Sequence, residues 1–143
     1  MRFTDVQIAY LTSQRLGRLA TVGPDGMPHV VPTGYRYNLE LGTIDVGGDN
    51  FASRKKYRDA LRHPKIAFVV DDIASVSPWR VRGIEIRGQV QVLETGGTEL
   101  GPGFAPQMFR ITPQRIIGWG LEGPAARTSA QTPQSGAAPP VTG

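Results

Sequence analysis

The fold class is decided by Ile84-Glu85-Ile86-Arg87-Gly88-Gln89-Val90-Gln91-Val92, where apolar residues or glycine stand at every even position and polar residues at every odd one. Because successive side chains of a β-strand point to opposite faces, this alternation predicts a strand with one buried and one wet face. A second run, Ile66-Ala67-Phe68-Val69-Val70, is apolar throughout and is followed by two aspartates. We expect this run to be the central strand, buried on both faces.

Four more strands are expected around these two. Residues 16–22, 29–37 and 43–46 form a meander, and Gly23-Pro24-Asp25-Gly26 makes a tight turn between the first two, since proline fixes φ and glycine accepts positive φ. Residues 108–111 and 114–121 supply the last strand. A closed sheet leaves no exposed edges, so six mainly antiparallel strands predict a small β-barrel.

Two short helices are expected beside the strands. Thr4 is a candidate N-cap for a helix over residues 4–11. Residues 51–62 have helix-forming composition, with Asp49 or Asn50 as N-cap and Pro64 as the stop signal. The fold class is therefore mainly β with short flanking helices.

Composition excludes several classes of protein. The 143 residues include 18 glycines and 12 prolines, too many for a helical bundle. The absence of cysteine excludes disulfides, thiol catalysis and cysteine zinc sites, and the two histidines, His29 and His63, predict no metal site. No apolar run approaches the ~20 residues that span a membrane, and no signal-type stretch follows Met1, so we expect a cytoplasmic protein without membrane contact.

The chain divides into one domain and a tail. Residues 1–123 contain all the predicted strands and helices, and their apolar content suffices for one core. Residues 124–143 are rich in proline and alanine and hold one charged residue, Arg127. Such a composition cannot offset the entropy of ordering, so we expect this tail to be disordered.

The net charge of +4 is concentrated in one part of the chain. Residues 51–65 hold six basic residues and one acidic residue, which suggests a discrete anionic partner such as a phosphate; the alternative is a solvated helix face. At the start of this helix, backbone N–H groups, a hydroxyl and several cations would together form an anion pocket. The side chains of that pocket are Ser53, Arg54, Lys55 and Lys56.

Several motifs resemble one protein family. They are Leu16-Gly17-Arg18-Leu19-Ala20-Thr21-Val22, Asp25-Gly26-Met27-Pro28-His29-Val30-Val31-Pro32, the Ser-Arg-Lys-Lys run, and His63-Pro64-Lys65-Ile66-Ala67. With them the chain, over roughly residues 3–121, resembles the pyridoxamine 5'-phosphate oxidase-like superfamily. Pro78-Trp79-Arg80 and Gly101-Pro102-Gly103-Phe104 are most similar to its F-420-dependent branch. The resemblance implies a six-stranded antiparallel split β-barrel that binds flavin mononucleotide (FMN) or the deazaflavin coenzyme F-420 at a homodimer interface.

The resemblance also implies particular binding residues. A strand triplet would lie along the cofactor ring, Arg36 matches a lysine that reaches the phosphate, and a pair of glycines would let the backbone approach the cofactor. The Ser-Arg-Lys triplet matches literally at residues 53–55, but counting back from Pro64 places the family's lysine at Lys56, so we favour both lysines, with Arg54 next. The cofactor residues implied in this way are Val31, Pro32, Thr33, Arg36, Gly47, Gly48, Ser53, Arg54, Lys55 and Lys56.

Two positions depart from the true pyridoxamine phosphate oxidases. Val31 replaces a phosphate-binding arginine, and Gly83 replaces a cofactor-binding glutamine. Both departures argue against the vitamin reaction itself. We expect instead an F-420-dependent oxidoreductase that transfers hydride to or from a small organic substrate, with no residue assigned as general acid or base because the cofactor carries the chemistry.

Three alternatives remain open. One is an FMN-binding oxidoreductase of the same fold, and another is a non-catalytic carrier of F-420. A module for single-stranded nucleic acid, with Tyr35, Tyr37 and Tyr57 as stacking platforms, is disfavoured because the positive charge is concentrated in one helix. The polyglutamate tail of F-420 could use the outer basic residues Arg58, Arg62 and Lys65. Trp79 is expected to plug one end of the barrel, with capping of the partner's cofactor as the alternative.

Overall fold

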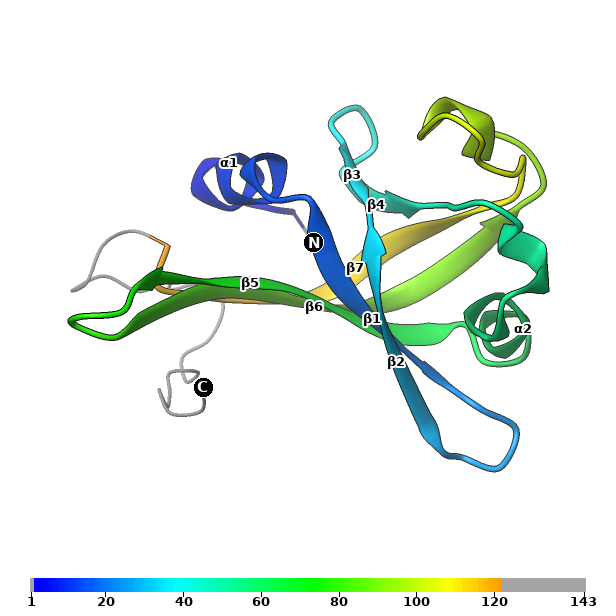
Figure 1. Cartoon of the computed structure of the whole chain (residues 1–143), viewed down its shortest axis with the longest axis horizontal. Helices are drawn as coiled ribbons and strands as arrows, with labels where there is room; N and C mark the ends of the chain where they lie inside the picture. The colour runs from blue at the N-terminus through cyan, green and yellow to red at the C-terminus, as the bar shows by residue number, and fades with distance from the viewer. Residues whose placement is uncertain (1, 122–143) are drawn as a thin grey trace.

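The described part of the chain, residues 2–121 of a computed structural model, forms one antiparallel sheet with two α-helices beside it (Figure 1). In the sheet the strand order is β2-β1-β5-β6-β7-β4-β3. The helices are α1 (Asp5–Ser13) and α2 (Lys55–Arg62), and two 3-10 turns are η1 (Phe51–Ser53) and η2 (Gly97–Glu99). The strands are β1 (Leu16–Val22), β2 (Pro28–Gly34), β3 (Arg36–Asn38), β4 (Thr43–Val46), β5 (Lys65–Ser75), β6 (Arg80–Leu93) and β7 (Met108–Trp119).

Chain connectivity forces the sheet to curl. β2 and β3 are the two outermost strands of the sheet, yet only Tyr35 separates them in the sequence. The end of β2 and the start of β3 are therefore only one residue apart. The sheet must bend round into a barrel to bring these two edge strands together. Because β2 and β3 do not pair with each other, the barrel is split along this line. The expected mainly β split barrel is confirmed.

The strand count differs from the expected six. The segment predicted as one strand over residues 29–37 breaks at Tyr35 into β2 and β3, which belong to opposite edges. The two pieces expected near the C-terminal end run through Pro113 as the single strand β7. The described residues thus contain seven strands. The alternation of side chains does not show that the chain leaves one edge of the sheet at Tyr35 and joins the other, so the sequence predicts one strand there instead of two.

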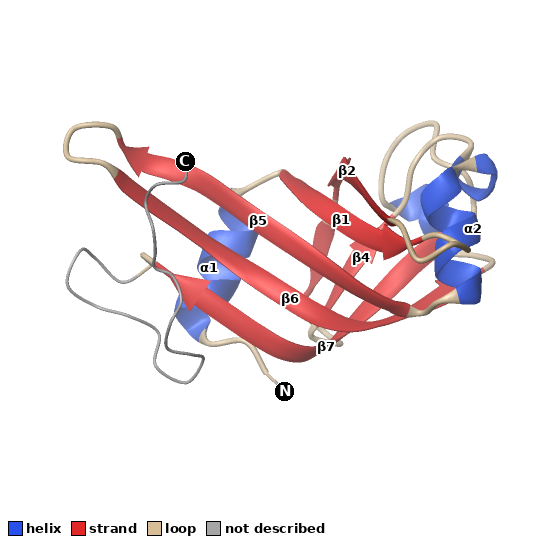
Figure 2. Cartoon of the chain, turned by 90° about the horizontal axis from the view of Figure 1, so that it is seen from below, coloured by secondary structure: helices blue, strands red, loops and turns tan. Residues whose placement is uncertain are grey.

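The prediction of the central strand was wrong. β6, which contains the alternating stretch, has three strands on each side of it in the sheet order, and β5 lies next to it. Figure 2 shows β5, β6 and β7 running side by side as the long strands of the sheet. Ile66 and Phe68 of β5 are buried, whereas Ala67 and Val69 are half-buried, so only one face of this apolar run is covered within the protomer.

The helices are positioned by specific contacts. In α1, Thr4 and Gln7 form the reciprocal capping box, and Tyr10 Oη donates a 2.8 Å hydrogen bond to Asp72 of β5. The expected cap of the second helix was wrong: Asn50 has φ 52° and no side-chain capping bond, and α2 begins only after Arg54. An aromatic cluster holds this region, with the ring centroids of Phe51 and Phe109 4.7 Å apart and those of Tyr57 and Phe109 5.9 Å apart.

The remaining expectations concern Trp79, membrane and metal binding, and the C-terminal tail. Trp79 is 41% exposed on the β5–β6 hairpin and does not plug the barrel. Within residues 2–121, no helix is long and apolar enough to cross a membrane, and no three potential ligand side chains are grouped to hold a metal ion. The tail expected over residues 124–143 lies outside the described residues.

Replacing Gly88 tests the packing between β6 and β7. A Cβ at this position would lie 2.2 Å from the Thr112 carbonyl oxygen, at the bulge where the β6–β7 register shifts. Gly88→Ala should therefore lower the free energy of unfolding by about 1–3 kcal/mol, measured by urea denaturation. Gln89→Ala, at the exposed neighbouring position, is the control and should change it little. Equal stability of Gly88→Ala and the wild type would contradict this account of the bulge.

Candidate functional site

Lys56 points from α2 toward the inner face of β2. Its Nζ lies 3.4 Å from Thr33 Oγ1 and 5.4 Å from the centroid of the Phe51 ring. The side chain is half-buried, and within residues 2–121 it takes part in no salt bridge. A partly desolvated ammonium with a hydroxyl and an aromatic ring as neighbours is suited to binding an anion.

The electrostatics of Lys56 support this assignment. Burial and the nearby charge of Arg54 lower the pKa of Lys56 below its usual value, and Asp49 opposes them only in part. The groups around the Lys56 ammonium therefore supply too little negative charge to stabilise its cationic form fully. A bound phosphate would supply that charge and raise the pKa again.

Lys55, one position earlier, has a different neighbour. Its Nζ lies 3.1 Å from Oδ2 of Asp59, whose side chain is only 2% exposed. Thr21 Oγ1 of β1 also donates to this carboxylate, over 3.3 Å. Burial alone would raise the pKa of Asp59, but the hydrogen bonds and charges, chiefly those of Lys55, lower it overall. Asp59 thus fastens α2 to β1 through Thr21, Lys55 neutralises its buried carboxylate from within the helix, and Lys56 points toward Thr33 instead.

Ser53 and Arg54 lie at the rim of this region. Ser53 and Arg54 are both exposed. The Ser53 hydroxyl donates a 2.9 Å hydrogen bond to the Asn50 carbonyl. Arg54 Nη2 pairs with Asp49 Oδ1 at 3.1 Å. Both side chains are therefore held by the loop that precedes α2, and their remaining polar atoms face solvent.

The residues implied along the cofactor ring divide between the two faces of β2. Thr33 is buried opposite Gly17, and Val31 lies opposite Leu19, so both share the inner face. Pro32 alternates to the outer face and is exposed. The structure brings Thr33 and Lys56 together and places Val31 on the same side.

The glycine pair follows β4 and is closely packed. A Cβ on Gly47 would lie 3.1 Å from Leu100 Cδ1 and 3.3 Å from Phe104 Cδ2, so little more than a hydrogen fits there. A Cβ on Gly48 would lie 3.7 Å from Phe51 Cδ1, an ordinary contact distance. Gly48 is half-buried beside the Phe51 ring, and its carbonyl accepts a 2.9 Å hydrogen bond from the Ala105 N–H.

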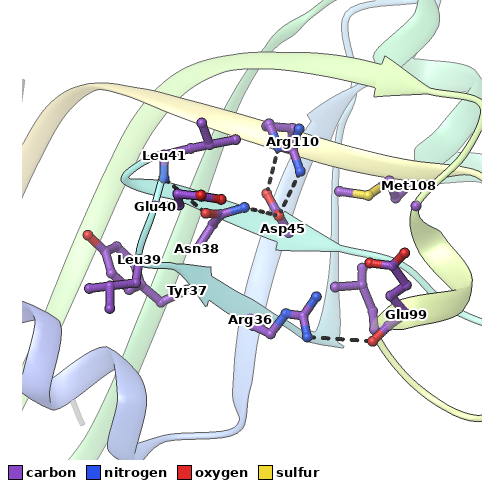
Figure 3. Close-up of a pocket in the computed structure, with 12 residues that line it drawn as sticks. Arg36, Tyr37, Asn38, Leu39, Glu40, Leu41, Asp45, Glu99, Met108 and Arg110 are labelled. Carbon is purple, nitrogen blue, oxygen red and sulfur yellow. Dashed lines mark hydrogen bonds and ion pairs between the residues drawn. The ribbon is translucent and has the colours of Figure 1, made fainter.

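Arg36 lies on the other edge of the split, at the start of β3. Its Nη1 reaches the Glu99 carbonyl oxygen over 3.5 Å, and its side chain lines a pocket of about 550 Å³ (Figure 3). The pocket is formed by the β3–β4 hairpin, η2 and β7. At one side Asp45, 2% exposed, accepts two hydrogen bonds from Arg110, 3.2 and 3.1 Å long.

Asp45 and Arg110 are not among the site residues predicted from the sequence. Each is a charged residue inside a short apolar segment, which was the available signal. Their pairing depends on the register of β4 against β7, where the two residues stand directly opposite each other. That register joins segments 65 positions apart and is not visible in the sequence.

The two lysines give a matched test of stability. Lys55→Met leaves the buried Asp59 carboxylate with Thr21 alone and should lower the free energy of unfolding by about 1–3 kcal/mol at neutral pH. Lys56→Met should change it little, because no buried carboxylate loses its partner. Urea denaturation of both variants measures the difference.

The pH dependence adds a second arm to this test. Because folding lowers the pKa of Asp59 below its ordinary 3.8, the stabilisation from the ion pair is complete above that pH and lost as the pH falls through the lowered value. The stabilities of the wild type and Lys55→Met should therefore converge in strong acid. A constant difference across that range would exclude the Asp59 pair as its source.

The chain is similar to known proteins over most of its length. The family model described as "Pyridoxamine 5'-phosphate oxidase" matches residues 3–120. The 5a,11a-dehydrotetracycline/5a,11a-dehydrooxytetracycline reductase of Streptomyces rimosus is 45% identical over 123 residues, which cover 86% of this chain and 87% of that protein.

Solved structures share the fold at low identity. A conserved hypothetical protein of Mycobacterium tuberculosis has a TM-score of 0.66 at 20% identity, covering 90% of this chain and 94% of that one. An FAD-binding protein of Mesorhizobium loti has a TM-score of 0.58 at 20% identity, covering 81% and 94%. On the match over residues 3–120 and the 45% identical relative, the chain belongs to the pyridoxamine 5'-phosphate oxidase family.

Proposed function

We propose that this protein is a homodimeric F-420-dependent oxidoreductase that transfers hydride between the deazaflavin ring and a small conjugated ketone. The 45% identical relative is a reductase, and the chain is accordingly an oxidoreductase. The observation that carries the finer proposal is the half-buried Lys56 ammonium, 3.4 Å from Thr33 Oγ1 and without a salt-bridge partner in the described residues.

The residues around the split fit a phosphorylated cofactor. Lys56 and Thr33 would hold a phosphate oxygen by a charge-assisted hydrogen bond and a hydroxyl donor, with Arg36 on the opposite edge as a second cation. Gly48, which follows β4, has no side chain to limit the approach of a ligand. Lys56 and Thr33 are contributed by α2 and β2, so they meet only in the folded chain.

The edges of the sheet would orient the ring. β2 and β3 are edge strands, so each has a row of backbone N–H and C=O groups that the sheet does not use. Val31 offers an apolar side chain on the inner face of β2, against which a flat ring can pack. When bound, the deazaflavin supplies the hydride chemistry; the protein binds and orients it and keeps water away.

The proposed substrate class is based on the name of the 45% identical relative. That protein is named for the reduction of 5a,11a-dehydrotetracycline, and the match covers nearly all of both chains. We propose a substrate of the same chemical type, a polycyclic ketone with a conjugated carbon–carbon double bond. Hydride would add to one carbon of that bond and a proton from water to the other, so that the double bond is reduced.

The homodimer is supported by the outer face of the sheet. Val30, Ala20 and Ala67 stand in register across β2, β1 and β5, and Val30 is 63% exposed. Val69 and Pro32 stand in the next row, on either side of Arg18. An apolar face of this kind in a soluble enzyme is typical of an interface between subunits. A second copy on this face would lie next to Pro32, the exposed residue of the implied ring-binding triplet.

Cofactor titration of one charge variant tests the proposed site. Lys56→Met should weaken F-420 binding by about 10- to 100-fold, the effect of losing one charged hydrogen bond to phosphate. Cofactor fluorescence at physiological salt measures the affinity, and FMN is titrated in parallel. Arg2→Met, at an exposed position before α1 with the same change of charge, is the control and should bind F-420 like the wild type.

The same titration can overturn the proposal. Preference of the wild type for FMN would assign the protein to the flavin enzymes of this fold. Equal losses in Lys56→Met and Arg2→Met would show that only the general positive charge of the protein contributes to binding. Tight F-420 binding, with reduced F-420 left unoxidised by a panel of conjugated polycyclic ketones, would favour a carrier.

A charge placed on the outer face tests the dimer. Val30→Glu would put a carboxylate opposite Ala20 in the apolar row and should convert the dimer to a monomer, because an unpaired charge cannot be buried in an interface without a large free-energy cost. Sedimentation velocity at micromolar concentration measures the mass. Thr95→Glu, at an exposed position outside the sheet, is the control. A monomeric wild type would contradict the proposed assembly.

A further inference from the structure

An ion pair lies on the outer face of the sheet, next to the proposed position of the cofactor ring. Arg18 of β1 stands directly opposite Pro32 of β2, the exposed residue of the implied ring-binding triplet. Arg18 Nη1 donates a 2.5 Å hydrogen bond to Oδ1 of Asp71, which lies two residues beyond Val69 on β5. Side chains that stand opposite each other on neighbouring strands have their Cβ atoms about 4.5–5.5 Å apart. The Arg18 guanidinium is therefore within reach of a ligand that covers Pro32.

Both charges of this pair remain available to a ligand. The side chains of Arg18 and Asp71 are 42% and 40% exposed. A guanidinium carries several N–H donors in a fixed fork, and within residues 2–121 Arg18 uses only Nη1. Oδ2 of Asp71 accepts no hydrogen bond from the same part of the chain. A ligand can therefore contact a cation and an anion side by side without breaking the pair.

An aromatic ring lies next to the ion pair. Gly83 of β6 stands opposite both Asp71 of β5 and Trp119 of β7. A Cβ on Gly83 would lie 2.7 Å from Trp119 Cζ2 and 2.9 Å from Asp71 Cβ, so the indole occupies the space that a side chain would need. Trp119 is only half-buried, and its ring can accept a flat ligand. We call the group of Arg18, Pro32, Val69, Asp71 and Trp119 the outer platform.

The outer platform extends past the apolar row assigned to the dimer. Val30, Ala20 and Ala67 of that row lie on one side of Arg18, whereas Asp71 and Trp119 lie on the other. A role in ligand binding and a role in subunit association therefore predict different effects when the ion pair is changed.

The geometry of hydride transfer connects the outer platform to the proposed ring. The two reacting carbons must come within about 3–3.5 Å of each other, so the substrate has to stack on one face of the ring. Val31 would pack against the ring from the inner face of β2, the edge strand. The substrate is then left with the outer side, above Pro32 and Arg18.

We propose that the outer platform binds the substrate, a flat polycyclic ketone that carries both an acidic enol and a cationic amine. This inference rests on the proposed function. The ring system would pack against Trp119 and Pro32, the ketone oxygen would accept a hydrogen bond from Arg18, and the ammonium would donate to Asp71.

Arg18 would also stabilise the charge that develops during the reaction. When hydride from the reduced deazaflavin adds to one carbon of the conjugated double bond, the π electrons of that bond move toward the ketone, whose oxygen becomes an enolate. A proton from water then reaches the other carbon, and the deazaflavin is left oxidised. A guanidinium fixed beside the oxygen lowers the free energy of the enolate more than that of the neutral ketone.

Tetracycline tests the outer platform without the cofactor, because at neutral pH this polycyclic molecule carries an enolate and a dimethylammonium group. Isothermal titration calorimetry on the cofactor-free protein should show that Arg18→Met weakens binding about 10- to 100-fold and Asp71→Asn about fivefold. 4-Dedimethylaminotetracycline, which lacks the amine, should bind Asp71→Asn as well as the wild type. Arg2→Met, exposed and with the same change of charge as Arg18→Met, is the control and should bind tetracycline like the wild type.

Kinetics with reduced F-420 and 5a,11a-dehydrotetracycline test the stabilisation of the enolate. Arg18→Met should lower kcat as well as raise KM, because the full charge on the oxygen develops only in the transition state. Its affinity for F-420 should stay unchanged, since Arg18 is not part of the phosphate site. The variant should fold, because a half-exposed ion pair contributes little to stability, and sedimentation velocity should show the same mass as for the wild type.

The outcomes separate this inference from the proposed function. Equal tetracycline affinities of the wild type and Arg18→Met, or no binding by the wild type, would overturn the outer platform and leave the cofactor proposal intact. A monomeric Arg18→Met would assign the ion pair to the dimer interface and overturn it as well. If F-420 does not bind while tetracycline binds in a manner sensitive to both Arg18 and Asp71, the proposed function fails and the outer platform stands.

Discussion

The single residue between β2 and β3 is the constraint on which the rest of the structure depends. Tyr35 joins the two edges of a seven-stranded sheet, and the sheet must therefore curl until its edges meet at this point. The side chain of Tyr35 is fixed in turn: its hydroxyl donates a 2.6 Å hydrogen bond to the Leu11 carbonyl of α1, and its ring packs edge-on against Phe68 at 5.5 Å. The split, the two free strand edges and the position of Arg36 all follow from this junction.

The second requirement is that α2 is held beneath the split at a fixed rotation. The hydrogen bond from Thr21 to the buried Asp59, whose charge Lys55 neutralises, ties one side of the helix to β1, and the packing of Tyr57 against Phe109 holds another. Successive residues of a helix are about 100° apart. The adjacent Lys56 must therefore point elsewhere, and it reaches Thr33. A structural lysine thus directs a candidate binding lysine, and the two adjacent cations have different roles.

Much of the fold could be predicted from local patterns. The alternation over residues 84–92 marked β6, the N-cap candidate Thr4 marked the start of α1, and the turn after Val22 marked the first hairpin. The errors arose where neighbours distant in sequence decide. Residues 66–70 are apolar on both faces, but the face carrying Ala67 and Val69 is left uncovered within the protomer, so a pattern typical of a central strand belongs to the strand beside it.

The sequence by itself determined the fold class and the concentration of positive charge near α2, because both depend on residue types at short spacing, and the resemblance to a known family supplied the set of candidate binding residues. Only the tertiary structure decided which of those residues meet. It placed Val31 and Thr33 on one face and Pro32 on the other, assigned Lys55 to Asp59 and Lys56 to the split, and paired Asp45 with Arg110 beside the pocket. These contacts depend on strand register and helix rotation, which are set by the packing of the whole barrel and leave no local signal in the chain.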